Sequence, residues 1–190
     1  MTVRPWPDHL LSLQEWDELP EDRSHHLELV EGVLVVAPRP APQHQIAMTN
    51  LTSALNRQLP GTLTATPDTE VVIDSTFPPT VRAPDVLVMS RSLYERNPPR
   101  IDAGEVLLAV EIVSPGTGRR DRFVKAGEYA GAGIPYHWII DLTPPASLTT
   151  LALVGREYEI TDKATGPITL SEPATITVDV SRLTQPSYLW

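Results

Sequence analysis

The sequence predicts an α/β fold in which helices flank a central mixed β-sheet, followed by a C-terminal antiparallel β extension. Residues 106–113 and 136–141 are apolar strand candidates on either side of a helical stretch at 121–132. A strand, a helix and a strand in succession favour a right-handed parallel crossover. Residues 43–59 repeat apolar side chains at helical spacing, which indicates a helix that packs on a sheet.

The N-terminal part is expected to hold a short helix and a β-hairpin. Ser12 to Glu15 has the form of a capping box, at the start of a helix that ends near Pro20. Residues 25–30 and 33–36 flank Glu31-Gly32, which is typical of a tight turn between paired strands. A helix over the first of these two arms is the alternative.

Further strands are expected at residues 64–74 and 82–89, and Ser114-Pro115-Gly116 should break the strand at 106–113. From residue 147 onward the chain is rich in Thr and Val with Gly and Pro between them, which predicts two or more antiparallel strands. We expect one domain over residues 1–190, with a core at about 13–141 and the β extension at 147–190.

Composition places the chain among ordinary globular proteins, with 41% hydrophobic and 21% charged residues in 190. No apolar run approaches the roughly 18 to 20 residues that cross a bilayer. The first residues lack the apolar core of a secretory signal, and the absence of cysteine excludes disulfides and thiolate metal sites. The cytoplasm is therefore the expected location.

The formal net charge of −9 disfavours non-specific binding to nucleic acid, because Lys and Arg supply most of that affinity by neutralising phosphates. Local distribution matters more than the total, however. Arg119, Arg120, Arg122 and Lys125 place four of the 15 basic residues within seven positions. These arginines are candidate phosphate contacts, with a solvated helix face as the alternative.

Two acidic residues inside apolar stretches are the main indication of chemistry. Asp85 lies in the stretch at 82–89 and Glu111 in the stretch at 106–113. A buried carboxylate is costly unless a cation, a metal or strong hydrogen-bond donors compensate it. If the two strands pair antiparallel, the start of one meets the end of the other, so the two carboxylates can converge. Lys125 follows on the next predicted helix.

Two carboxylates and a lysine are the minimum set for metal-assisted hydrolysis of a phosphodiester. Carboxylates hold a hard divalent ion, which activates a bound water, and the lysine stabilises charge that develops on phosphate oxygens. Each residue also has a structural interpretation. Asp85 could cap a turn after Pro84, Glu111 could pair with an arginine of the next helix, and Lys125 could be solvated.

The order and spacing of several short motifs resemble the Uma2 family of restriction endonucleases, a branch of the PD-(D/E)XK nuclease superfamily, over roughly residues 13 to 141. The matching stretches are Leu27 to Gly32, His44-Gln45, Arg82 to Val86, Val110 to Pro115, Arg119-Arg120-Asp121 with Lys125 and Tyr129, and Gly133 with Tyr136 to Asp141. Val113 stands where the superfamily usually carries its lysine. The branch carries that lysine on the next helix, where Lys125 stands.

The resemblance implies a restriction-endonuclease-like fold and magnesium-dependent hydrolysis of phosphodiester bonds in nucleic acid, with DNA as the expected substrate and manganese as an alternative ion. Asp85 and Glu111 would be metal ligands, and Lys125 the catalytic cation. Glu28 would be an auxiliary acid, as a third ligand or a group that positions water.

His44 and Glu31 are further candidate auxiliary residues, although a lone histidine near a helix start is often structural and Glu31 fits a turn. The resemblance also implies a homodimer. Two other classes of function stay open. The first is a nuclease fold that serves as a non-catalytic binding or interaction module, which the acidic net charge favours. The second is a metal hydrolase that acts on small phosphate esters.

Overall fold

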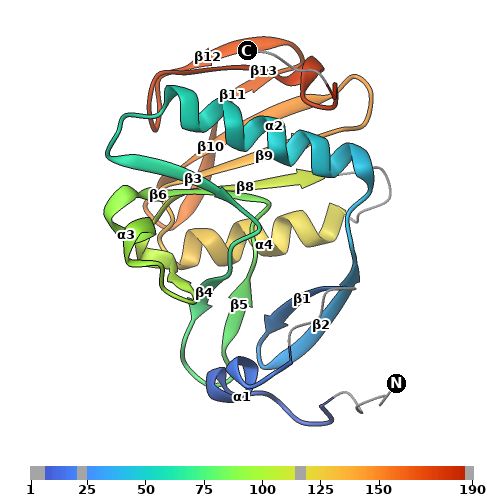
Figure 1. Cartoon of the computed structure of the whole chain (residues 1–190), viewed down its shortest axis with the longest axis vertical. Helices are drawn as coiled ribbons and strands as arrows, with labels where there is room; N and C mark the ends of the chain where they lie inside the picture. The colour runs from blue at the N-terminus through green and yellow to red at the C-terminus, as the bar shows by residue number, and fades with distance from the viewer. Residues whose placement is uncertain (1–6, 21–24, 114–118, 187–190) are drawn as a thin grey trace.

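The computed structural model describes residues 7–20, 25–113 and 119–186, and the side chains of α4 from Phe123 onward (Figure 1). The helices are α1 (Leu13–Asp17), α2 (Pro42–Gln58), α3 (Arg91–Arg96) and α4 (Arg119–Gly131), with 3-10 turns η1 (Ala103–Glu105) and η2 (Val180–Arg182). The strands are β1 (His25–Val30), β2 (Val33–Pro38), β3 (Leu63–Pro67), β4 (Val71–Asp74), β5 (Thr80–Arg82), β6 (Val86–Ser90), β7 (Ile101–Asp102), β8 (Val106–Val113), β9 (Tyr136–Asp141), β10 (Ser147–Val154), β11 (Glu157–Ala164), β12 (Pro167–Leu170) and β13 (Ile176–Asp179).

A six-stranded mixed sheet in the order β11-β10-β9-β8-β6-β3 forms the centre of the molecule. Strands β8 and β9 run parallel, as the crossover through α4 requires, and the other neighbours are antiparallel. Helix α2 covers one face of this sheet and α4 the other (Figure 1). The predicted α/β fold with a mixed sheet between helices is confirmed.

The two faces of the sheet bury different residues because side chains alternate along a strand. On the α2 face, Leu51 and Leu55 pack with Val88 and Leu108 in the main apolar core. On the α4 face, Tyr129 belongs to a second cluster with Leu87 and Ala109. Strand β8 is therefore buried on both sides, which accounts for its nearly continuous apolar sequence.

A second sheet of five strands, in the order β2-β1-β5-β4-β7, lies on the α4 side of the molecule (Figure 1). Its hairpin β1–β2 pairs from His25↔Pro38 to Val30↔Val33, so the predicted hairpin is correct. Helix α1 begins with the expected capping box at Ser12 and packs its Trp16 with Leu29 of β1. The N-terminal helix therefore packs against β1 and holds it in place.

The C-terminal antiparallel extension is present as the continuation β10–β11 of the central sheet and the separate pair β12–β13. This pair is held to α2, because Gln58 of α2 exchanges two hydrogen bonds with the backbone of Thr177. None of the helices in the described parts of the chain is long and apolar enough to span a membrane.

Two of the expected strands are wrong as single elements. The stretch at 64–74 is divided into β3 and β4, and the stretch at 82–89 into β5 and β6, with the two members of each pair in different sheets. The first break contains Asp68, whose φ of 44° turns the chain. Apolar runs look alike on both sides of such a break, so hydrophobicity alone does not reveal a change of sheet. Helix α3 was not expected either.

The turn between β1 and β2 requires its glycine. Glu31 and Gly32 have φ values of 48° and 75°, the combination of a type I′ turn. A Cβ at Gly32 would lie 3.0 Å from the Cβ of Leu10 and 3.1 Å from that of Pro78. Both the backbone conformation and the close packing therefore select glycine.

We expect Gly32→Ala to lower the free energy of unfolding by more than about 1 kcal/mol, because the change adds both backbone strain and a steric clash. Gly61→Ala is the control, since nothing lies within 4 Å of a Cβ built there. Urea denaturation measures both variants. Equal stability of the two would show that the turn does not depend on glycine.

Candidate active site

Asp85 lies where the chain passes from the five-stranded sheet to the six-stranded sheet, directly before β6. Strand β6 pairs antiparallel with β8 and sets Val86 opposite Val110, which brings Asp85 to the end of β8. The Ile112 N–H donates a hydrogen bond of 2.6 Å to Asp85 Oδ2. The start of one strand and the end of the next therefore meet, as the sequence suggested.

Glu111 points from β8 toward α4 and is enclosed by two donors of that helix. The Tyr129 hydroxyl donates to Glu111 Oε1 at 2.6 Å, and Lys125 Nζ lies 3.1 Å from Glu111 Oε2. Burial raises the pKa of the Glu111 carboxyl to about 7; Lys125 opposes this rise and the charge of Asp85 adds to it. The two acids are thus close enough to influence each other.

Lys125 is buried between two carboxylates, with its Nζ 3.0 Å from Glu28 Oε1 and 3.1 Å from Glu111 Oε2. Burial alone would lower the pKa of this lysine, but the carboxylates of Glu111 and Glu28 raise it above its ordinary value. The ammonium group therefore stays charged. Lys125 is therefore not a solvated lysine on the helix surface, which was its alternative structural interpretation.

Glu28 is engaged by a second cation as well. Arg82 Nη1 donates to Glu28 Oε2 at 2.8 Å, while the other side of the guanidinium holds Glu128 of α4 through two bonds of 2.7 Å. The Ala83 N–H also donates to Glu28 Oε1. Burial would raise the pKa of Glu28, yet its cationic neighbours hold it well below the ordinary range. Glu28 thus acts as a charged anchor for Lys125 and Arg82.

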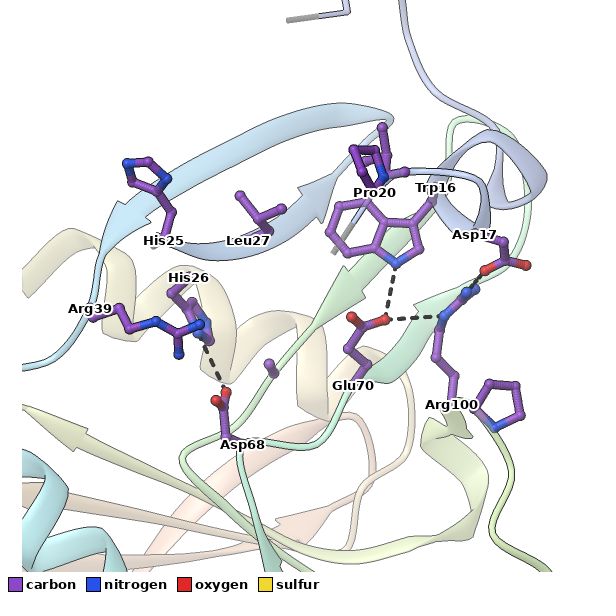
Figure 2. Close-up of a pocket in the computed structure, with 13 residues that line it drawn as sticks. Trp16, Asp17, Pro20, His25, His26, Leu27, Arg39, Asp68, Glu70 and Arg100 are labelled. Atoms are coloured by element: carbon purple, nitrogen blue, oxygen red, sulfur yellow. Dashed lines mark hydrogen bonds and ion pairs between the residues drawn. The ribbon is translucent and has the colours of Figure 1, made fainter. Parts of the chain in front are cut away.

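A pocket of about 340 Å³ lies between α1, β1 and the segment before β4 (Figure 2). His26 forms part of its wall, 3.4 Å from Asp68 Oδ1 and 3.8 Å from Glu28 Oε1. Asp68, and then Glu28, raise the pKa of His26 to about 10. His26 is therefore a further positive charge beside Glu28.

Four other side chains of this pocket pair with one another. Glu70 accepts hydrogen bonds from Trp16 Nε1 at 3.0 Å and from Arg100 Nε at 3.1 Å, and Arg100 also pairs with Asp17 (Figure 2). These contacts tie α1 to the strand segment that follows β3. They give the pocket a structural function, the attachment of the N-terminal helix.

His44, in the first turn of α2, also reaches the end of β8. Its Nε2 lies 2.9 Å from the Ile112 carbonyl oxygen and 3.2 Å from Asp85 Oδ1. Burial lowers the pKa of His44, but Asp85 outweighs this effect and the pKa is raised overall. Three segments distant in sequence thus meet at one point: the start of α2, the residue before β6 and the end of β8.

The donors at this point suit a magnesium-type ion. Asp85 and Glu111 offer carboxylate oxygens, and the Ile112 carbonyl offers a third oxygen, which lies with Asp85 Oδ1 around the same His44 Nε2. Within the described residues, no group of three or more His, Cys, Asp or Glu side chains is arranged to hold a metal ion. Mg²⁺ is commonly bound by only one or two carboxylates and keeps several waters, so the set fits this ion.

Four candidate residues remain. Glu31 belongs to the β1–β2 turn, where its N–H donates to Thr80 Oγ1 at 3.1 Å. The side chains of Arg119, Arg120 and Arg122 lie outside the described residues, as does the break at Ser114-Pro115-Gly116. Sequence reasoning assigned no function to Arg82, Glu128 or Tyr129. The one signal available in the sequence concerned Arg82, a lone arginine in the same apolar stretch as Asp85.

Comparison with solved structures supports the fold class. The chain is similar to a crystal structure from Anabaena variabilis described as a "putative nuclease belonging to DUF820", with a TM-score of 0.68 and 20% sequence identity. The match covers 92% of this chain and 97% of the other. At this identity the likeness establishes a nuclease-like fold.

The family follows from the sequence match. The model of the Uma2 family, described as "Putative restriction endonuclease", matches residues 13–186. The chain therefore belongs to the Uma2 family, and the expected resemblance is confirmed. No curated protein matches the chain.

The buried Arg82 predicts a large stability effect. We expect Arg82→Met to lower the free energy of unfolding by about 3–5 kcal/mol, because it leaves the carboxylates of Glu28 and Glu128 without their shared cation. Arg96→Met is the matched control. Its ion pair with Glu105 is exposed and contributes at most about 1 kcal/mol. Chemical denaturation measures both variants. Equal losses of unfolding free energy in the two would contradict the conclusion that Arg82 stabilises the fold by compensating Glu28 and Glu128.

The raised pKa of Glu111 predicts a pH dependence. Without metal, the folded protein keeps the Glu111 proton up to about pH 7, whereas the unfolded chain releases it near the ordinary value of 4.5. This contribution to stability is therefore present below pH 4.5 and is lost as the pH rises toward 7. Glu111→Gln should remove that slope from thermal melts. Magnesium should raise the melting temperature of the parent more than that of the variant. If the melting temperatures of the parent and of Glu111→Gln change with pH in the same way, the raised pKa of Glu111 is contradicted.

Proposed function

We propose that this protein is a divalent-metal-dependent endonuclease that hydrolyses phosphodiester bonds, with DNA as its substrate. The observation that carries the proposal is the convergence of Asp85, Glu111 and Lys125 at one end of the central sheet. Membership of the Uma2 family supports a nuclease activity. The metal, the type of nucleic acid and the function of each residue belong to the proposal.

In this proposal, Asp85, Glu111 and the Ile112 carbonyl hold the divalent ion. When bound, the ion polarises the phosphoryl group and lowers the pKa of a water. The charge of Asp85 contributes to the raised pKa of Glu111, so a cation between the two carboxylates would relieve their repulsion. The two acids therefore work as a pair, and neither alone provides the site.

Lys125 stabilises the negative charge that develops on the phosphate oxygens. An ammonium group has three N–H donors, and Glu28 and Glu111 account for two of them. Within the described part of the chain the third donor has no partner, and in this proposal it contacts a phosphate oxygen without loss of either anchor. In this proposal Glu28 orients Lys125. This function differs from that of a third metal ligand, which was one of the two functions expected for Glu28 from the sequence.

Arg119, Arg120 and Arg122 are proposed to contact phosphates of the substrate on either side of the bond that is cut. A homodimer, in which each copy cuts one strand of a duplex, is also part of the proposal. Sedimentation velocity tests it, and the mass of a single copy at working concentration would contradict it. The cytoplasm remains the proposed location.

We expect Lys125→Ala to lower turnover on plasmid DNA about 10²- to 10³-fold, as the loss of one preorganised donor does in other enzymes. Binding of Mg²⁺ or Mn²⁺, measured by calorimetry, should survive because lysine is not a ligand. Lys163→Ala is the matched control, since Lys163 is an exposed lysine on β11. Thermal melting shows whether each variant is folded.

Equal turnover of parent and Lys125→Ala would contradict the catalytic function of Lys125. If the folded parent cleaves no nucleic acid with either metal, the acidic net charge of −9 makes a non-catalytic binding module the better description. Cleavage of a small phosphate ester but not of DNA or RNA would identify the third class considered from the sequence.

A further inference from the structure

His44 connects helix α2 to the atoms that line the proposed metal site. Its side chain is buried, with 6% of the residue exposed, and it comes from an element that is distant in sequence from both acids. The position of α2 is set by Ala47, Leu51 and Leu55, which are fully buried in the main core. The ring therefore has a defined place with respect to β8.

The contacts of the ring indicate which nitrogen carries the proton. Nε2 faces two oxygens, the Ile112 carbonyl at 2.9 Å and Asp85 Oδ1 at 3.2 Å. A carbonyl and an ionised carboxylate only accept hydrogen bonds, so a lone pair on Nε2 would be repelled by both. Nδ1 is buried and has no hydrogen-bond partner among the residues that the structure describes. The proton of the neutral ring therefore lies on Nε2, and His44 is a donor at this point.

This donor completes a clamp on Asp85. His44 Nε2 lies 3.2 Å from Oδ1, and the N–H of Ile112 donates to Oδ2 at 2.6 Å, so each carboxylate oxygen has a donor group beside it. The same Nε2–H also holds the Ile112 carbonyl. Each of these oxygens has a second lone pair. A hydrogen bond from His44 therefore orients the oxygens and leaves them able to bind a cation.

We propose that His44 is a positioning residue, which fixes Asp85 and the Ile112 carbonyl as ligands through its Nε2–H and does not bind the metal itself. The inference rests on the proposed function, because it assigns the way in which the same cation site is organised. Hydrogen bonds to metal ligands of this kind affect metal affinity strongly, since they set the direction of the donor atoms.

The test compares Mn²⁺ affinity, measured by calorimetry, in the parent, His44→Ala and His44→Gln. Glutamine keeps an N–H donor at a similar reach but has no ring nitrogen. We expect His44→Ala to weaken binding about 10- to 100-fold and His44→Gln to restore most of the loss. Gln43→Ala, an exposed change in the same helical turn, is the control and should bind as the parent does.

Three outcomes would overturn the inference: unchanged affinity in His44→Ala, tighter binding in His44→Ala, or equal losses in the Ala and Gln variants. Tighter binding would make His44 a competitor of the metal. Equal losses would mean that the ring acts through packing alone.

A measurement on the parent protein keeps the inference testable if a variant fails to fold. With ¹⁵N-labelled histidine, NMR of the metal-free protein at a pH where the ring is neutral should show the Nε2–H form for His44, and pulsed EPR with Mn²⁺ should show no nitrogen bound directly to the metal. The opposite tautomer or a directly bound nitrogen would contradict the proposal. Metal binding that survives in Asp85→Asn, or is absent from the parent, would instead refute the proposed metal site.

Discussion

The burial of three ionisable side chains at one end of the central sheet is the constraint on which the rest of this structure depends. Lys125 lies between Glu28 and Glu111, and none of the three could be buried alone without a large cost in desolvation. Arg82 and the Ala83 N–H also donate to Glu28, and Tyr129 donates to Glu111. The charges therefore require one another, and each comes from a different element.

The same constraint explains why the chain changes sheets where it does. Arg82 ends β5 in the five-stranded sheet, and Asp85 precedes β6 in the six-stranded sheet. The short connection between them brings Arg82 to Glu28 and Asp85 to Ile112. Because one segment joins the two sheets and also carries two polar anchors, the fold and the site cannot be separated. The N-terminal hairpin is part of the site for the same reason, since β1 supplies Glu28.

A second consequence is that the polar interior is held from both faces of the sheet. On one face, α4 contributes Lys125, Glu128 and Tyr129. On the other, α2 contributes His44, which contacts Asp85 at the end of β8. Buried polar groups are stabilising only when their partners are in place, so the two helices and the sheet must assemble together.

The sequence by itself determined the main elements, the antiparallel meeting of two acidic strand ends and the lysine on the following helix, because periodicity and local order report burial and chain direction. It indicated Asp85, Glu111 and Lys125 as a group for this reason. Only the tertiary structure decided which groups compensate these charges. The pairing of Glu28 with Arg82 and Lys125, and of His44 with Asp85, joins residues 54, 97 and 41 positions apart, as their numbers show. Such contacts depend on how helices and sheets pack, and local sequence patterns carry no information about that packing. The division of two apolar stretches between different sheets escaped prediction for the same reason.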